Sequence, residues 1–208
     1  MSGTHGALRL IELTSAHLCH GFSDLVGSLD HSFAAPASSV PLGPDAKKVA
    51  ISAAQALAMR LELRRAAWGP DGGSMTLARI EALAGGLPQQ VAVDVSAVDQ
   101  STVFAPAVGR IVLNLLLLAA DSLPSGGTVV LAGAAHDLFV RIAGPAAAWP
   151  ARISVCVSDE MEARSALTEG RSLQMALTTL LAHAAGIRLS VVLPPVARNE
   201  PPILRLGG

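Results

Sequence analysis

Two stretches with apolar residues at helical spacing begin this chain, and a short linker rich in proline and serine separates them. The first covers residues 8–33, and a heptad places mostly apolar residues at its a and d positions: Leu8, Ile11, Ser15, Leu18, Phe22, Leu25, Leu29 and Ser32. Such a pattern predicts an amphipathic helix with a coiled-coil-like seam. The linker, residues 34–44, cannot continue that helix because of its prolines.

The second stretch, residues 44–68, carries its own apolar stripe, which consists of Ala50, Ala54, Leu57, Leu61 and Trp68. Its first turn contains Asp45, whose carboxylate interacts favourably with the helix dipole, and the segment GPDGG (69–73) ends it. Two long helices joined by a short connection form an antiparallel hairpin. Because two helices cannot enclose a core and four can, the two stripes predict a symmetric homodimer held by a four-helix bundle.

The rest of the chain changes character and mixes strand-like with helix-like segments. Strands are predicted where apolar and β-branched residues cluster or alternate, at residues 91–95, 128–132, 137–143, 153–157 and 189–193. Helices are predicted at residues 77–84, 102–123 and 172–185, and the tail, residues 201–208, is expected to be a last edge segment or loose chain. The predicted fold class is therefore α+β, with a helical-hairpin domain at residues 8–70 followed by an α+β domain at residues 74–206.

The balance of charge and hydropathy excludes several classes of protein. Fifteen Lys and Arg against sixteen Asp and Glu leave a formal net charge of −1, so the chain has no overall attraction for nucleic acid. The most apolar stretch, residues 111–120, is half as long as the ~20 residues that a membrane span needs. The first residues lack the basic and apolar regions of a signal peptide, and Cys19 and Cys156 do not make a disulfide framework. A cytoplasmic location without a membrane partner is expected.

His20 is the candidate functional residue of the first helix. With Leu18 at position d, His20 falls at f, which points directly away from the seam. A neutral imidazole nitrogen can attack a phosphoryl group without deprotonation by a strong base, and a rigid, exposed platform lets a partner approach it. Asp24, one turn further along the helix, can orient the ring.

His20 has two simpler interpretations, a solvated surface residue and a metal ligand. Most exposed histidines on helices are solvated and have no function, and position alone leaves that interpretation open. A metal site shared with His17 and Cys19 is disfavoured, because Cys19 falls at position e and points away from both histidines.

Three segments carry a resemblance to a known family. The segment LCHGFSDLVGSLD (18–30) resembles the phosphoacceptor helix of bacterial ChpT-type histidine phosphotransferases, which begins with Leu-Cys-His-Asp-Phe. The segment RIVLNLLLLAADSLPSGGTVVLAG (110–133) is similar to a helix, turn and strand of that family, and HAAGIRLSVVL (183–193) is similar to its last helix and strand. Together the three segments span most of the chain, from residue 18 to residue 193, in the family's order.

The resemblance implies a dimer formed through a four-helix bundle, and a second domain with a histidine-kinase ATPase-like fold that has lost its nucleotide. It also implies that His20 accepts a phosphoryl group from the receiver domain of a hybrid histidine kinase and passes it to a response regulator. This sequence departs from the family at Gly21, where the family has an acidic residue, and at Leu25, where it has proline. The acidic residue helps a kinase to abstract the imidazole proton during attack on ATP, so Gly21 weakens an autokinase interpretation.

An ATP-dependent histidine kinase is the less favoured enzyme, because residues for Mg-ATP are missing. Where the long helix of an active kinase carries its metal-binding asparagine, this chain has Leu118, which offers no oxygen to Mg²⁺. Asn114 alone is expected to be a structural hydrogen-bonding residue. Residues 142–147 hold no acid for adenine, and Pro145 removes a backbone donor. No cofactor is therefore expected on this chain, and the partner receiver domain supplies Mg²⁺ for the transfer.

Arg60 is the candidate cation for the transfer. In a hairpin that turns near residue 38, Arg60 lies ~4–5 Å along the helix axis from the level of His20, within reach of a phosphoryl group. A solvated face formed by Arg60, Arg64 and Arg65 is an equally good interpretation. The alternative for the whole chain is a non-catalytic dimeric adaptor that binds receiver domains with the same surface.

Overall fold

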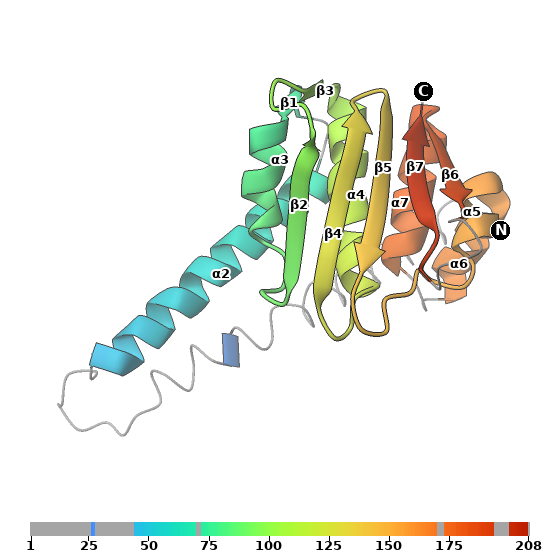
Figure 1. The fold of residues 1–208 in the computed structure, drawn as a ribbon. Helices are drawn as coiled ribbons and strands as arrows, with labels where there is room; N and C mark the ends of the chain where they lie inside the picture. Colours follow the sequence, from blue (N-terminus) through green and yellow to red (C-terminus); the bar gives the residue numbers. More distant parts are fainter. Residues whose placement is uncertain (1–25, 28–43, 70–71, 170–172, 194–199, 208) are drawn as a thin grey trace. The chain divides into compact units, whose positions relative to one another are not determined.

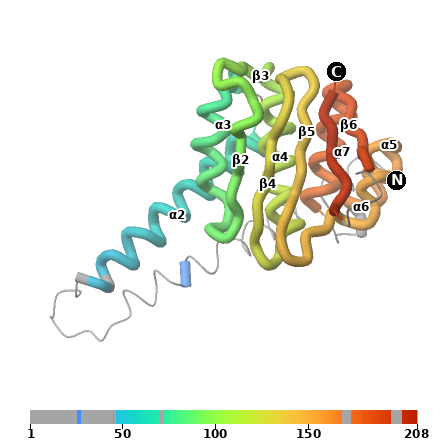
Figure 2. Tube along the Cα trace, in the orientation of Figure 1, coloured from blue at the N-terminus to red at the C-terminus, as the bar shows by residue number. Residues whose placement is uncertain are grey.

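The computed structural model describes residues 26–27, 44–69, 72–169, 173–193 and 200–207 (Figures 1 and 2). The chain divides into two compact units, Met1–Glu62 and Leu63–Gly208. The first predicted helix, residues 8–33, lies outside the described residues except for Val26 and Gly27, which are helical. The hairpin, the four-helix bundle and the domain boundaries at residues 8–70 and 74–206 therefore stay predictions.

The second predicted helix is confirmed as α2, Pro44–Trp68. Asp45 lies in its first turn and Arg65 in its last turn, so each charge interacts favourably with the partial charge of its helix end. The backbone N–H of Gly69 donates to the Arg65 carbonyl at 2.9 Å and closes the last turn. Neither α2 nor any other helix in the described part of the chain is both long enough and apolar enough to cross a membrane.

A five-stranded mixed sheet organises the second unit, in the order β2-β4-β5-β7-β6 (Figure 1). Its strands are β2 (Val91–Val98), β4 (Gly127–Ala134), β5 (Asp137–Ala143), β7 (Ile203–Gly207) and β6 (Arg188–Val192). The pair β2 and β4 is parallel, as a helical crossover requires, and all other neighbours are antiparallel. A separate two-stranded antiparallel sheet joins β1 (Met75–Thr76) to β3 (Val103–Phe104).

Helices cover one face of the five-stranded sheet (Figures 1 and 2). They are α3 (Leu77–Ala84), α4 (Pro106–Asp121) and α7 (Leu173–Ala185), with the shorter α5 (Ile153–Ser158) and α6 (Glu160–Glu169) beside α7. The centre of the core is α4, in which every residue from 111 to 119 is buried. The sheet contributes side chains at most 1% exposed, namely Val129, Leu131, Leu138, Val140 and Ile142. Because each large aliphatic side chain buried in this way contributes roughly 1.5–3 kcal/mol, this layer dominates the stability of the second unit.

Two predicted elements differ from the structure. Residues 153–157, predicted as a strand, belong to the helix α5, because the buried residues Ile153, Cys156 and Val157 follow the i, i+3, i+4 spacing of a helix. The tail forms β7, but it is not an edge, since it pairs with β5 on one side and β6 on the other. Leu204 and Leu206 alternate into the core at 0% and 2% exposure, which gives the tail a central place in the sheet.

The long helix predicted at residues 102–123 is shorter in the structure, where α4 begins only at Pro106. The two residues of β3 pair with β1 before the helix starts, and Pro106 occupies its first turn, where a missing N–H has no cost. The helix α6 has no counterpart among the predicted elements.

Candidate functional site

The structure describes one of the three predicted site residues. Arg60 lies on α2 within the first unit, and it is half-buried. His20 and Asp24 lie outside the described residues, so their positions relative to Arg60 stay predictions. The described parts of the candidate site are therefore α2 and the helix α4, which holds the positions that a kinase uses for nucleotide.

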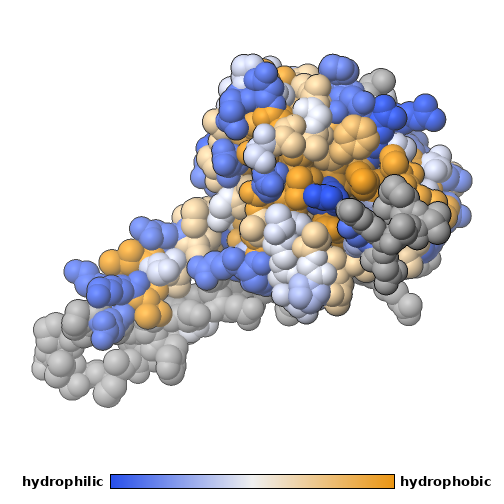
Figure 3. All heavy atoms as spheres, in the orientation of Figure 1, coloured by the Kyte–Doolittle hydropathy of each residue, from blue (hydrophilic) through white to orange (hydrophobic). Residues whose placement is uncertain are grey.

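Within the first unit, α2 carries two adjacent rows of residues at three- and four-residue spacing. One row is buried at Ala50 and Ala53, at 6% and 8% exposure, and continues half-buried through Leu57 and Arg60. The other row, called here the exposed seam of α2, consists of Ile51, Ala54, Ala58 and Leu61. Its two large side chains are each 47% exposed, and Figure 3 shows apolar residues among hydrophilic ones over this helix. The single predicted stripe is thus divided between two faces, as in a bundle helix that contacts two neighbours.

The end of α2, which belongs to the second unit, is held by side chains of α4. The Asn114 Nδ2 donates to the Ala67 carbonyl at 2.7 Å and to the Arg110 carbonyl at 2.9 Å. The Arg110 guanidinium donates to the carbonyls of Ala67, at 3.2 Å, and Trp68, at 3.4 Å. Because the last carbonyls of a helix have no partner within it, these donors satisfy groups that would otherwise be left unpaired.

A second helix, α7, completes this polar cluster. The Gln174 Nε2 donates to the Asn114 Oδ1 at 2.9 Å, and the Thr178 hydroxyl donates to the Gln174 carbonyl at 2.7 Å. All three residues are at most 3% exposed. Sequence reasoning missed Gln174 and Thr178 as partners, although two uncharged polar residues one turn apart in a mostly apolar helix are a signal for a buried network.

The polar cluster includes Asn114, which lies in the segment that the sequence analysis compared with the nucleotide-binding helix of a kinase. Both amino hydrogens of Asn114 are used by carbonyls of the protein, and Leu118, at the position of the metal-binding asparagine in a kinase, is 1% exposed in the core. After β5, Gly144 lies so close to the turn at Gly126 that a Cβ would stand 2.5 Å from the Gly126 carbonyl oxygen. Among the described residues no three His, Cys, Asp or Glu side chains converge to hold a metal ion.

Arg64 and Asp121 interact electrostatically within the second unit. The Arg64 guanidinium carbon lies 5.7 Å from the centroid of the Trp68 ring, a cation–π distance. Asp121 ends α4, and desolvation raises the pKa of its carboxyl to about 6, against a smaller opposite effect of the Arg64 charge. The sequence singled out Arg64 with Arg60 but gave no reason to pair it with Trp68 or Asp121.

Comparison with known proteins gives both a family and a fold. A family model described as the histidine phosphotransferase C-terminal domain matches residues 77–195. No curated protein matches the chain. A solved structure described as a bacterial phosphotransferase superposes with a TM-score of 0.70 at 20% identity and covers 96% of each chain. Full-length ShkA in complex with AMPPNP aligns with a TM-score of 0.42 at 14% identity, over 94% of this chain and 44% of ShkA.

Different comparisons show the fold and the family. The likeness to the bacterial phosphotransferase shows a shared fold. The family model runs from α3 through β6, which is more than half of the chain, and it includes the Asn114 cluster between α4 and α7. The chain therefore belongs to the family defined by the histidine phosphotransferase C-terminal domain.

Proposed function

We propose that this chain is a histidine phosphotransferase of a two-component phosphorelay and that His20 is its phosphoacceptor. The observation that carries the proposal is the histidine phosphotransferase family match over residues 77–195. The donor is the receiver domain of a hybrid histidine kinase, and the acceptor is a response regulator.

The proposed reaction transfers one phosphoryl group from aspartate to histidine. A neutral nitrogen of the His20 imidazole attacks the phosphorus of the receiver's aspartyl phosphate, and the N–P bond forms as the bond from phosphorus to the carboxylate oxygen breaks. The other ring nitrogen keeps its proton, and the carboxylate leaves as an anion. The receiver supplies Mg²⁺, Asp24 orients the ring, and Arg60 stabilises charge on the phosphoryl group. The same steps in reverse deliver the group to the response regulator.

The shape of α2 supports this role for Arg60. The helix is continuous over 25 residues, and Arg60 lies half-buried in the row that begins with Ala50 and Ala53 rather than on a loop. A long basic side chain can keep its stem against apolar residues while its charged end contacts water. A cation held on a rigid element stabilises a loose transition state better than a mobile one, because less ordering is needed during the reaction.

The contacts of α4 support a carrier rather than a kinase. Asn114 is committed to the end of α2 and to Gln174, and Leu118 lies in the core. We therefore propose that this chain has no ATP-dependent kinase activity and binds no cofactor of its own.

The exposed seam of α2 supports a homodimer. Ile51, Ala54, Ala58 and Leu61 repeat at the spacing of a bundle seam, and a second copy related by a twofold axis would cover them. We propose a four-helix bundle built from residues 8–70 of two copies, with residues 74–206 as the second domain. The proposed location is the cytoplasm, where receiver domains and response regulators meet.

A phosphotransfer assay tests the site. The purified chain is incubated with a receiver domain that carries a radiolabelled aspartyl phosphate, in the presence of Mg²⁺. Label that is stable in base and labile in acid should appear on this chain, and His20→Ala should abolish it. The matched controls His17→Ala and His31→Ala should keep the label, and loss of label in either one instead of His20→Ala would contradict the assignment.

The same assay separates the alternatives. A dimeric adaptor would bind the receiver, seen by a mobility shift or calorimetry, without taking label at any histidine. A histidine kinase would take label from ATP alone, in the absence of any receiver. Either result would replace the phosphotransferase proposal.

A further inference from the structure

A cavity of about 630 Å³ opens beside β6, at the end of the five-stranded sheet. One wall is formed by residues 186–191, and the other by α5 and α7 through Ser154, Val157, Ser158, Thr179, Ala182 and His183. Cavities that bind ligands typically have volumes of ~300–1,000 Å³, so this one is large enough for a ligand. Arg60, the predicted site residue that the structure describes, is not among the lining residues.

The cavity runs along the edge of β6 rather than over a face of the sheet. Successive side chains of a strand point to opposite faces, so a cavity over one face is lined by alternate residues. Here the cavity is lined by four consecutive residues of β6, namely Arg188, Leu189, Ser190 and Val191. Among the strands that the structure describes, β7 is the only neighbour of β6, and alternate residues of such an edge strand direct their N–H and C=O groups outward. The strand wall of the cavity therefore offers backbone hydrogen-bonding groups.

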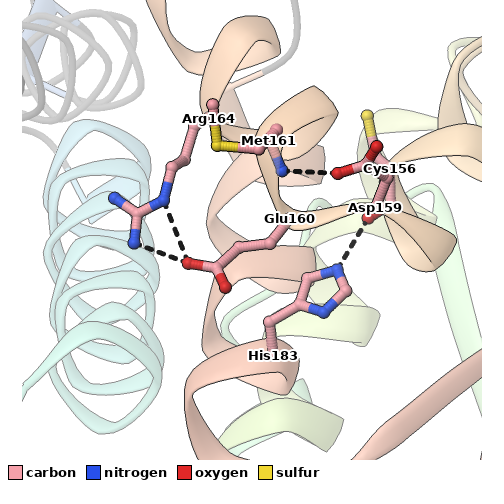
Figure 4. A network of polar contacts seen from close by, with 6 residues as sticks. All are labelled: Cys156, Asp159, Glu160, Met161, Arg164 and His183. Atoms are coloured by element: carbon pink, nitrogen blue, oxygen red, sulfur yellow. Dashed lines mark hydrogen bonds and ion pairs between the residues drawn. The ribbon is translucent and has the colours of Figure 1, made fainter. Parts of the chain in front are cut away.

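A hydrogen bond joins the two helices of the helix wall, and the carboxylates near this wall are not among the lining residues. The His183 Nε2 lies 3.0 Å from the Cys156 carbonyl oxygen, which links α7 to α5 (Figure 4). Asp159 accepts a hydrogen bond from the Met161 N–H at 2.7 Å, and Glu160 accepts one from Arg164 Nε at 2.9 Å. The carboxylates near His183 are thus engaged outside the lining.

The charge and polarity of the lining indicate what kind of segment fits. Among the lining residues Arg188 carries a positive charge and no side chain carries a negative one. Apolar side chains such as Val157 and Leu189 alternate with hydroxyls such as Ser158 and Ser190. An extended segment with apolar residues at every second position and one acidic side chain complements this lining.

We propose that the open edge of β6 binds an extended peptide segment of a partner protein, which joins the sheet as a further strand and places an acidic side chain against Arg188. The five residues of β6 span ~17 Å at ~3.3 Å per residue, so a segment of about five residues pairs with it. The helices α5 and α7 form the far wall of this groove, and Val157 and Ala182 receive the inward side chains of the peptide. Binding at this edge does not depend on His20 or on phosphoryl transfer.

A synthetic peptide tests the proposal. The probe is fluorescein-labelled Val-Thr-Val-Thr-Val-Glu, and its affinity for the full-length chain is measured by fluorescence anisotropy at pH 8. The matched probe carries N-methyl groups on its second to fifth residues, which remove two backbone donors from whichever edge faces β6 without changing charge. The parent probe should bind saturably and the methylated probe at least ~tenfold more weakly, since each lost hydrogen bond costs about 1 kcal/mol. No saturable binding, or equal binding of both probes, would overturn strand addition.

Charge reversal tests the position of the acidic side chain. Arg188→Glu should lower the affinity for the probe that ends in Glu at least ~tenfold. It should restore binding to a probe that ends in Lys. The control Arg79→Glu reverses an exposed charge on α3, outside the lining, and should leave both affinities unchanged. In amide NMR spectra the parent probe should shift residues 188–192 most. Shifts centred elsewhere, or no response to Arg188→Glu, would overturn the assignment even if phosphotransfer to His20 succeeds.

Discussion

At the scale of one residue, Asn114 shows how a buried polar side chain in an apolar helix finds hydrogen-bond partners. Its amide bonds a carbonyl of α2, a carbonyl of its own helix and the side chain of Gln174 on α7. The sequence predicted a structural hydrogen-bonding role for Asn114, and the structure confirms it. Its partners could not be predicted, because Ala67 and Gln174 lie 47 and 60 residues away in the chain.

Asp121 gives a prediction of pH dependence at the same scale. Its pKa is raised from an ordinary value of 3.8 to about 6, because desolvation disfavours the charged form. Between these values the native state binds more protons than the unfolded state, so the Asp121 contribution to the unfolding free energy is present below pH ~4 and lost as the pH rises through ~6. Asp121→Asn should remove this dependence and raise the unfolding free energy at pH 7, by about 1 kcal/mol or less, because the part of the residue that water reaches screens its charge. Urea unfolding from pH 4 to pH 7.5 measures both effects.

Asp99 is the matched control for that measurement. Hydrogen bonds from the Ser101 side chain and backbone lower the pKa of Asp99, so its contribution is lost only as the pH falls below its ordinary range. Asp99→Asn should therefore leave the difference between pH 5 and pH 7 unchanged. A pH dependence in Asp121→Asn as steep as that of the unchanged chain would contradict the role assigned to desolvation.

At the scale of elements, the sequence predicted those helix and strand bounds that are set by residues next to them in the chain. The bounds of α2, α3 and β5 were predicted to the residue, because stop signals such as Gly69 and Gly85 lie beside them. The short segment at residues 153–157 was predicted as a strand, because five residues of which four are apolar fit both a strand and a helix until their neighbours are known. The first helix, and with it the geometry of His20 and Asp24, is a prediction that the described residues do not test.

We expect a charged substitution in the exposed seam of α2 to weaken the proposed homodimer. A charged residue in the middle of a dimer seam is desolvated without a partner, so Leu61→Glu should weaken the proposed homodimer by at least ~tenfold in Kd. Analytical ultracentrifugation over a concentration series measures the change. Circular dichroism should show that the helix content of the variant is unchanged.

Met59 provides the control on the same helix. It is also exposed, at 43%, but it lies two residues away from Leu61 and so about 160° around the helix. Met59→Glu should therefore leave the dimer intact. If both variants dissociate equally, or if neither does, the exposed seam is not the dimer contact.

At the scale of the whole molecule, the order of the sheet is set by contacts that no local pattern records. The last strand, β7, inserts between β5 and β6, so the strand nearest the end of the chain is not at the edge. Both β6 and β7 have the short apolar pattern of a strand, and the sequence does not show which of them pairs with β5. Among the described strands, that choice leaves β6 at the end of the sheet, where the cavity beside α5 and α7 lies.

The contacts of the end of α2 determine where the second unit can be cut. Leu63 and Ala67 are 0% exposed, and the Ala67 carbonyl accepts hydrogen bonds from Asn114 and Arg110. A fragment of residues 63–208 keeps these contacts, whereas a fragment of residues 74–208 loses them. Loss of one buried leucine and of the partner of a buried amide should lower the unfolding free energy of the shorter fragment by about 3–5 kcal/mol. Urea unfolding of both fragments measures the difference.

Asn114→Ala in both fragments shows whether the cluster itself is responsible. In residues 63–208 the substitution should lower the unfolding free energy by about 1–3 kcal/mol, since the Ala67 carbonyl loses a buried donor. In residues 74–208 that carbonyl is absent, so the cost should be smaller and limited to the bonds with Arg110 and Gln174. Equal costs in the two fragments would mean that Asn114 serves α4 and α7 alone. The end of α2 would then be held by apolar burial, and the division of the chain after Glu62 would not depend on the polar cluster.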